Sequence, residues 1–126
     1  MDKEEQRKEK DMRQEAGNDK DVPPLACDFT AMDDKQRERY RALRRRLGED
    51  LEEARELEDG YAFRHSSEVL VALAEYVSLE RLCCPFFDFA IEVGHGKGEV
   101  WLRMTGPEGA KGILEAATSG HSWNRA

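Results

Sequence analysis

The clearest pattern in the chain is a strict alternation of large apolar and other positions near its C-terminal end. Residues 87–93 carry large apolar side chains at every odd position, and residues 100–104 carry them at every even position. A period of two is typical of strands that bury one face, and the glycine-rich residues between these segments are typical of a hairpin loop. The pattern predicts an antiparallel hairpin over 86–93 and 99–105. Its predicted buried side chains are Phe87, Phe89, Ile91, Val100, Leu102 and Met104.

A second alternation covers residues 61–65 and follows Asp59-Gly60, a pair that favours a tight hairpin turn. We predict a strand at 61–65. Residues 52–57, before the turn, admit two structures. Their composition favours a helix, whereas the turn favours a strand that pairs with 61–65, and these residues alone leave the choice open.

A third, shorter alternation lies at the start of the folded region. Leu25, Cys27, Phe29 and Ala31 share one side of an extended segment. This spacing predicts a short strand, and it predicts that Cys27 and Phe29 point together toward the core.

Three segments have the apolar spacing of amphipathic helices. The first has Asp33 or Asp34 as its expected N-cap and Gly48 as its expected last residue. The second is expected to begin at Ser66 or Ser67, and the third at Gly106-Pro107-Glu108. The predicted apolar stripes are Tyr40, Leu43 and Leu47 in the first helix, Leu70, Leu73, Ala74, Val77 and Cys84 in the second, and Ala110, Ile113, Leu114 and Ala117 in the third.

Together these elements predict a two-layer α+β fold, in which a mostly antiparallel sheet has helices packed on one face. Residues 25–118 are expected to form this single domain. Residues 1–24 are highly charged and hold few apolar side chains, so we expect a disordered arm. Residues 119–126 are expected to be a frayed tail.

The net charge and the cysteine content limit the functions and the cellular location that we expect for this protein. The net charge of −7 argues against binding to nucleic acid or to an anionic membrane surface. The chain has no apolar run long enough to span a bilayer and no secretory signal. Three cysteines, two of them adjacent, make a poor disulfide framework, so a reducing, cytoplasmic location is expected.

The first predicted helix carries many arginines around its apolar stripe. Such a run could bind phosphate. It could also be a solvated face whose cations favour the helix C-terminus, and the acidic total favours this second interpretation. The residues are Arg37, Arg39, Arg41, Arg44, Arg45 and Arg46.

The main chemical candidate is the stretch SLERLCCPFFDF, residues 78–89. Pro85 disfavours helical geometry in the residue before it, so Cys83 is expected near the last helical residue and Cys84 in the bend. With Cys27 as a third ligand, the thiolates would suit copper(I), zinc and, by the same softness, mercury or arsenic(III). Sulfurs that share one such ion should lie about 3.5–4 Å apart, given Zn–S bonds of ~2.3 Å.

Other observations favour inert cysteines. Adjacent helical side chains point about 100° apart, a helix C-terminus raises a thiol pKa, and free cysteine is among the most often buried residues. The alternative function is therefore a structural or protein-interaction module. Glu80 with Arg81 could act beside the thiols, although such neighbours are more often a solvated pair. No complete catalytic constellation and no resolving thiol is evident, which favours a binding role over a redox enzyme.

Two longer stretches carry a resemblance. Residues 80–89 read ERLCCPFFDF, and residues 101–111 read WLRMTGPEGAK. They resemble a group of small uncharacterised bacterial proteins that share E-R-x-C-C-P-F-x-x-F followed by L-R-x-T-G-P-E-G-x-K. The resemblance covers about residues 25–117. It implies a heavy-metal setting, with Cys83 and Cys84 as the residues to test, and a strand before Asp59-Gly60. A soft metal ion or metalloid, sequestered or handed on, is accordingly our leading hypothesis.

Overall fold

The structure is a computed structural model that describes residues 25–96 and 98–117. The expectations for the arm at 1–24 and the tail at 119–126 lie outside these residues. The described strands are β1 (Glu53–Leu57), β2 (Gly60–His65), β3 (Asp88–Val93) and β4 (Val100–Thr105). The described helices are α2 (Asp34–Asp50), α3 (Leu70–Cys83), α4 (Ala110–Ala117) and the short 3-10 helices η3 (Phe29–Ala31) and η4 (Ser67–Val69).

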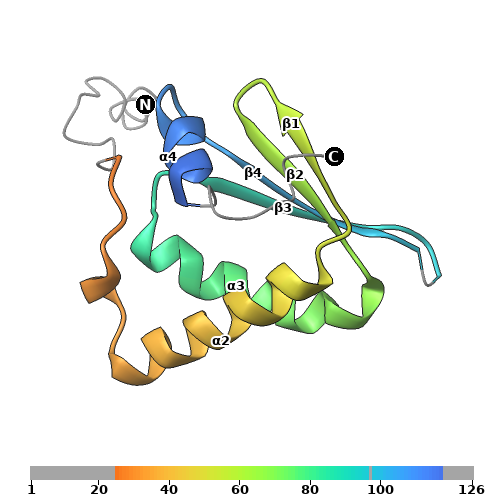
Figure 1. The fold of residues 1–126 in the computed structure, drawn as a ribbon, viewed down its shortest axis with the longest axis horizontal. Coiled ribbons are helices and arrows are strands. Elements are labelled where there is room, and N and C mark those ends of the chain that lie inside the picture. The colour runs from red at the N-terminus through yellow and green to blue at the C-terminus, as the bar shows by residue number, and fades with distance from the viewer. Residues whose placement is uncertain (1–24, 97, 118–126) are drawn as a thin grey trace, which may run out of the picture.

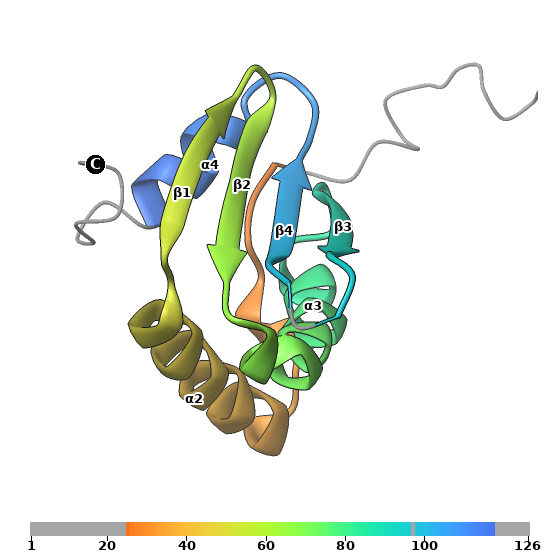
Figure 2. The same cartoon turned by 90° about the vertical axis from the view of Figure 1, so that its right-hand side faces the viewer.

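The described strands form one antiparallel sheet in the order β1-β2-β4-β3. Figure 1 shows α2 and α3 lying along one side of the sheet. Figure 2 looks onto the sheet, with the helices behind and below it. The predicted fold class is therefore confirmed: this is a two-layer α+β arrangement with helices packed on one face of the sheet.

The hydrophobic core lies between the sheet and the helices. Burial alternates along β4, where every second side chain is buried and the others are half-buried. This is the period expected of a strand that packs one face against a helical layer. Core side chains include Val100, Leu102 and Met104 from β4, Tyr40, Leu43 and Leu47 from α2, and Leu73, Leu79 and Cys83 from α3.

The predicted C-terminal hairpin is present. Phe89 on β3 lies opposite Met104 on β4, and Ile91 lies opposite Leu102. Phe89 and Ile91 are half-buried rather than buried, because β3 is an edge strand of the sheet. Phe87 is buried as predicted, although it precedes the first residue of β3.

The segment before Asp59 is a strand, β1, which pairs with β2 and places Ala54 opposite Phe63. The turn signal therefore overrides the helical propensity of this glutamate-rich segment. Gly60 is required at the start of β2, since a β-carbon there would lie 1.9 Å from the carbonyl oxygen of Met104. No other residue type allows β2 and β4 to approach so closely at this point.

The strand predicted over residues 25–31 is wrong. This segment contains the 3-10 helix η3, and the Asp28 carboxylate accepts hydrogen bonds from the backbone N–H and the hydroxyl of Thr30. Such local capping competes with extended structure. Cys27 is exposed and Phe29 is 45 % exposed, so neither points into the core as predicted.

The bounds of α2 differ from the prediction at one end only. Asp33 is the N-cap and forms a capping box with Gln36, as the acidic start of the helix suggested. The helix continues through Gly48 to Asp50. A single internal glycine costs roughly 1 kcal/mol relative to alanine, and the anchored Asp50 side chain, described below, holds the last turn in place.

The later helices also depart from the predicted stripes. Ala74 on α3 is exposed, whereas Ala72 and Leu79 are buried. Because α3 packs against both α2 and the sheet, its buried face is rotated from the predicted one. α4 begins at Ala110, later than predicted, because Gly109 has a φ of +96°, which lies outside helical geometry.

Asp50 joins the end of α2 to the end of β2. Its carboxylate accepts hydrogen bonds from the Ser66 backbone N–H at 3.0 Å and from the Ser66 hydroxyl at 2.8 Å, and it lies 3.2 Å from Nδ1 of His65. Burial raises the pKa of Asp50, but the bonds from Ser66 and His65 outweigh it, so the pKa lies below its ordinary value. Burial lowers the pKa of the His65 imidazole, even though Asp50 opposes that shift.

We expect Asp50→Asn to lower the free energy of unfolding by about 1–3 kcal/mol at neutral pH, because hydrogen bonds to a charged acceptor are lost. The adjacent, exposed Glu49 provides the control: Glu49→Gln should change stability by no more than ~0.5 kcal/mol. Since folding lowers the pKa of Asp50, its contribution is present above the unfolded value of about 3.9 and is lost as the pH falls through the folded value. Urea unfolding of the three proteins from neutral to strongly acidic pH measures this. Equal stability of the two variants at neutral pH would contradict the role of Asp50.

Candidate functional site

The adjacent cysteines lie at the point where α3 ends. Cys83 is the last residue of the helix, and Cys84 has left helical geometry with φ −128° and ψ 71°. Pro85 disfavours the α region for the residue before it, so the bend falls where the sequence predicted it. Because Cys84 is not helical, the angle of about 100° that separates adjacent side chains on a helix does not apply to Cys83 and Cys84. As a result, the sulfurs of Cys83 and Cys84 lie 3.6 Å apart, within the predicted range.

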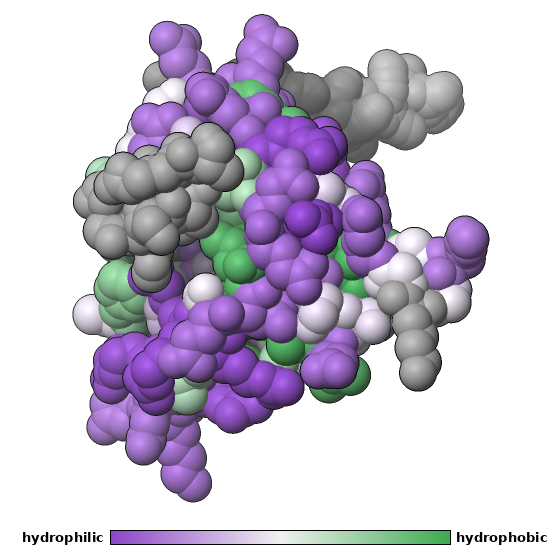
Figure 3. All heavy atoms as spheres, turned by 45° about the vertical axis from the view of Figure 1, so that its right-hand side comes forward, coloured by the Kyte–Doolittle hydropathy of each residue, from purple (hydrophilic) through white to green (hydrophobic). Residues whose placement is uncertain are grey.

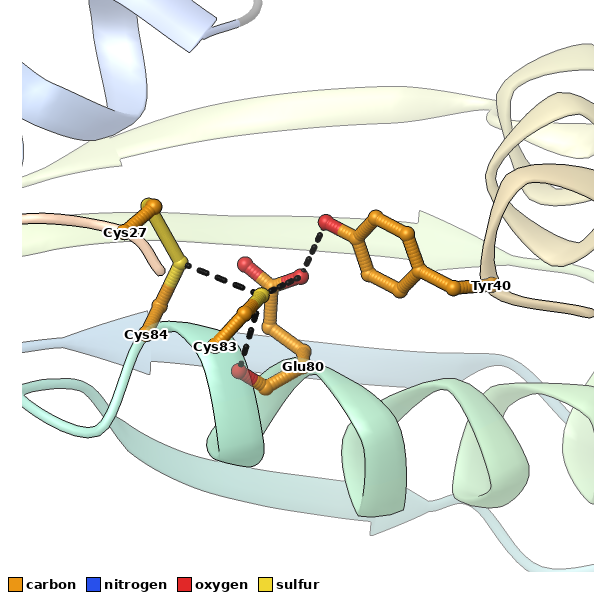
Figure 4. Close-up of a disulfide and its surroundings, with 5 residues drawn as sticks. All are labelled: Cys27, Tyr40, Glu80, Cys83 and Cys84. Carbon is orange, nitrogen blue, oxygen red and sulfur yellow. Dashed lines mark hydrogen bonds between the residues drawn. A yellow bond between two sulfur atoms is a disulfide. The ribbon is translucent and has the colours of Figure 1, made fainter. Parts of the chain in front are cut away.

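The N-terminal segment brings the third cysteine to this bend. The backbone N–H of Asp28 donates to the carbonyl oxygen of Cys83 at 2.7 Å. Beside this bond, Cys27 and Cys84, which are 57 positions apart in the sequence, form a disulfide with their Cα atoms 4.6 Å apart. The sequence-based view of these cysteines as a poor disulfide framework is therefore wrong for this pair. Figure 4 shows the disulfide beside the Cys83 side chain.

The three cysteines differ sharply in exposure. Cys83 and Cys84 are 0 % and 1 % exposed, whereas Cys27 lies at the surface. Cys83 is the free thiol of the three. One end of the disulfide is therefore at the surface, and its other end touches a buried thiol.

A buried carboxylate completes the cluster. Glu80 lies one helical turn before Cys83 and is 5 % exposed. One carboxylate oxygen of Glu80 accepts a hydrogen bond from the Tyr40 hydroxyl, which reaches it from α2 (Figure 4). The Cys83 sulfur lies 3.5 Å from the backbone carbonyl oxygen of Glu80 and 4.0 Å from the same carboxylate oxygen. Because Glu80 is buried and Arg81 is exposed, the expected solvated Glu80–Arg81 pair is not formed.

Burial and charge set the protonation of this cluster. Burial raises the pKa of the Glu80 carboxyl, and the bond from Tyr40 and the charge of Arg44 only partly offset it. Burial, followed by the neighbouring Glu80 charge, raises the pKa of the Cys83 thiol to about 11. At neutral pH the thiol therefore keeps its proton and can donate it to Glu80.

The arrangement is compact enough for one metal ion. One ligand atom from each of Glu80, Cys83 and Cys84 lies within 4.8 Å of the other two. The Cys84 sulfur is bonded to Cys27 in the disulfide, so it can serve as a ligand only after reduction. Reduction frees Cys27 at the same time, and the site then offers three sulfurs and one carboxylate. Sequence reasoning named the three cysteines but did not recognise Glu80 as buried; its position one turn before Cys83 was the available signal.

Comparisons of the chain with protein-family models, with curated proteins and with solved structures give no match. Among the described residues, no helix combines the length and the apolar character that a membrane span requires. The functional interpretation accordingly depends on the geometry of the cluster itself.

We expect Tyr40→Phe to lower the free energy of unfolding by about 1–3 kcal/mol, because the buried Glu80 carboxylate loses the donor from α2 and keeps only that of Tyr76 among its tyrosine donors. Tyr61 offers a matched control. Its hydroxyl donates to Glu115, which is exposed and can be solvated by water instead, so Tyr61→Phe should cost no more than ~0.5 kcal/mol. Chemical denaturation of both variants tests this, and equal losses would show that Glu80 does not depend on Tyr40.

Proposed function

We propose that the reduced protein binds one soft, thiophilic ion, a metal or a metalloid, through Cys83 and Cys84 with Cys27 as the third sulfur ligand. One observation carries the proposal. The sulfurs of Cys83 and Cys84 lie 3.6 Å apart, and the Cys27 sulfur is bonded to Cys84, so all three sulfurs occupy one small volume. Binding of this kind would sequester the ion or deliver it to another protein.

The composition of the site favours soft ions. Thiolates select copper(I), zinc and related thiophilic ions over hard, oxygen-seeking cations such as magnesium and calcium. Three sulfurs around one point suit a trigonal ion, and Glu80 adds an oxygen ligand for a tetrahedral one. A site made only of carboxylates would not discriminate in this way.

The disulfide makes the site dependent on reduction. An external dithiol supplies two electrons and two protons: the Cys27–Cys84 S–S bond breaks, two S–H groups form, and the dithiol becomes a disulfide. Attack is open at the Cys27 end, which is the exposed end. The oxidised chain lacks two of the three sulfur ligands, and the reduced chain has all three.

Glu80 has a defined role in the binding step. A thiol must lose its proton when it ligates a metal ion, and the thiol of Cys83 holds its proton firmly at neutral pH. Where Glu80 does not ligate the ion itself, its carboxylate, 4.0 Å from that sulfur, is the base in the cluster that can accept this proton. Its own pKa is raised by burial, which suits it to receive a proton.

A second function is favoured by a different observation. The nearly complete burial of Cys83 and Cys84 is also what inert packing would produce. In that case the disulfide would be a structural link in an interaction module. The two functions differ in their response to a thiophilic ion, and so they can be separated by titration.

We expect reduced wild-type protein to bind arsenite in a 1:1 complex and oxidised wild-type protein to bind it at least about 100-fold more weakly, a difference of ~2.7 kcal/mol. Cys83→Ser with Cys84→Ser should abolish tight binding. Calorimetric titration under anaerobic conditions, with tris(2-carboxyethyl)phosphine as reductant, measures all three affinities. The oxidised protein is the matched control, because it has the same sequence.

The surface position of Cys27 keeps the test decisive if the double variant is poorly folded. Cys27→Ser removes the third ligand without altering the buried pair, so its affinity for arsenite should fall at least about tenfold. Retained affinity in the folded double variant, or equal affinity of the oxidised and reduced wild type, would leave only the structural function.

A further inference from the structure

A second site candidate lies on α2, away from the sulfur atoms. Side chains of η3 and α2 line an open hollow of about 510 Å³. The α2 residues follow helical spacing, which places them on one side of the helix. In Figure 3, strongly hydrophilic side chains cover the lower end of the molecule, where α2 lies. We call this hollow the arginine groove; its lining residues are Phe29, Arg37, Tyr40, Arg41, Arg44 and Arg45.

The charge of the groove opposes that of the chain as a whole. The protein has a net charge of −7, yet four arginines line this hollow. Arg37 is already committed, because it donates to the carbonyl oxygens of Phe29 and Met32 and pairs with Asp34. No hydrogen bond or ion pair within residues 25–96 and 98–117 engages Arg41, Arg44 or Arg45. Arg41 and Arg45 thus line the hollow without an acidic partner in the described part of the chain, and Arg44 forms no ion pair there, although its charge acts on the buried Glu80.

Two aromatic side chains, Phe29 and Tyr40, line the groove beside these arginines. Phe29 is 45 % exposed, so part of its ring is open to solvent. Its ring lies 5.7 Å from that of Tyr40, centroid to centroid, and is tilted by 58°. A flat ring can pack against such an exposed aromatic side chain. The volume of the groove also falls within the range of roughly 300–1,000 Å³ that is typical of small-molecule sites.

The chemistry of the groove selects one class of ligand. Three guanidinium groups offer more N–H donors than the two oxygens of a carboxylate can accept, whereas a phosphate monoester has three terminal oxygens and a charge of about −1.5 to −2. We propose that the arginine groove binds a small organic phosphate, with its phosphate among Arg41, Arg44 and Arg45 and a flat ring against Phe29. This site does not rest on the proposed ion site, although Tyr40 and Arg44 lie near both.

Adenosine 5′-monophosphate, adenosine and inorganic phosphate are suitable probes for calorimetric titration of the full chain at low ionic strength. We expect the monophosphate to bind at least about tenfold more tightly than either fragment, because only it engages both the arginines and the ring. Phe29→Ala should weaken binding of the monophosphate but leave that of inorganic phosphate unchanged. Equal affinity for the monophosphate and inorganic phosphate would overturn the proposal, as would no binding of either.

Two neighbouring arginines provide a matched pair of variants. Arg45 and Arg46 are both exposed on α2, but only Arg45 lines the groove. Arg45→Gln should weaken binding of the monophosphate about tenfold, whereas Arg46→Gln should weaken it less than about twofold, the effect of a remote charge screened by salt. Equal losses in the two variants would show a general charge effect and would overturn the assigned site.

Discussion

The attachment of residues 27 and 28 to the end of α3 is the constraint on which both candidate sites depend. The Asp28 N–H binds the Cys83 carbonyl, and Cys27 is bonded to Cys84. A helix end leaves carbonyl groups without intrahelical partners, and Asp28 satisfies one of them. The same attachment places η3 over α2, so that Phe29 meets Tyr40 at the arginine groove. One junction therefore assembles the sulfur cluster and one wall of the groove.

Burying the Glu80 carboxylate costs free energy, and hydrogen bonds from neighbouring residues of the cluster offset part of this cost. Glu80 is removed from water, and Tyr40 donates a hydrogen bond to it. An unpaired buried carboxylate would carry a penalty of several kcal/mol, which pairing with donors reduces. The Cys83 thiol supplies a further weak donor. Arg44 links the two sites, because its charge favours ionisation of Glu80 and Cys83 while its side chain lines the groove. An anion bound in the arginine groove would partly neutralise the charge of Arg44 and so weaken its effect on the ionisation of Glu80 and Cys83.

The sequence predicted those elements that local pattern decides. The alternation at residues 87–93 and 100–104 identified the hairpin, and Pro85 identified the end of α3. Contacts between segments that are distant in the sequence could not be predicted from these local patterns. The alternation at 25–31 suggested a strand, but the hydrogen bonds that Thr30 donates to the Asp28 carboxylate favour a 3-10 turn. Only the fold shows that this turn lies beside Cys84. Glu80 was expected in solvent, because glutamate is almost never fully buried without a partner. Its partners are Tyr40, which lies 40 positions away in the sequence, and Tyr76 on the same helix.

X-ray absorption spectroscopy of the reduced protein loaded with one equivalent of arsenite tests the central claim most directly, because it counts the sulfur atoms bound to arsenic. The proposed site predicts three sulfurs from one chain, and two sulfurs with one oxygen in Cys27→Ser. A wild-type spectrum with only two sulfur ligands, unchanged in Cys27→Ser, would contradict the convergence of Cys27, Cys83 and Cys84 on one ion.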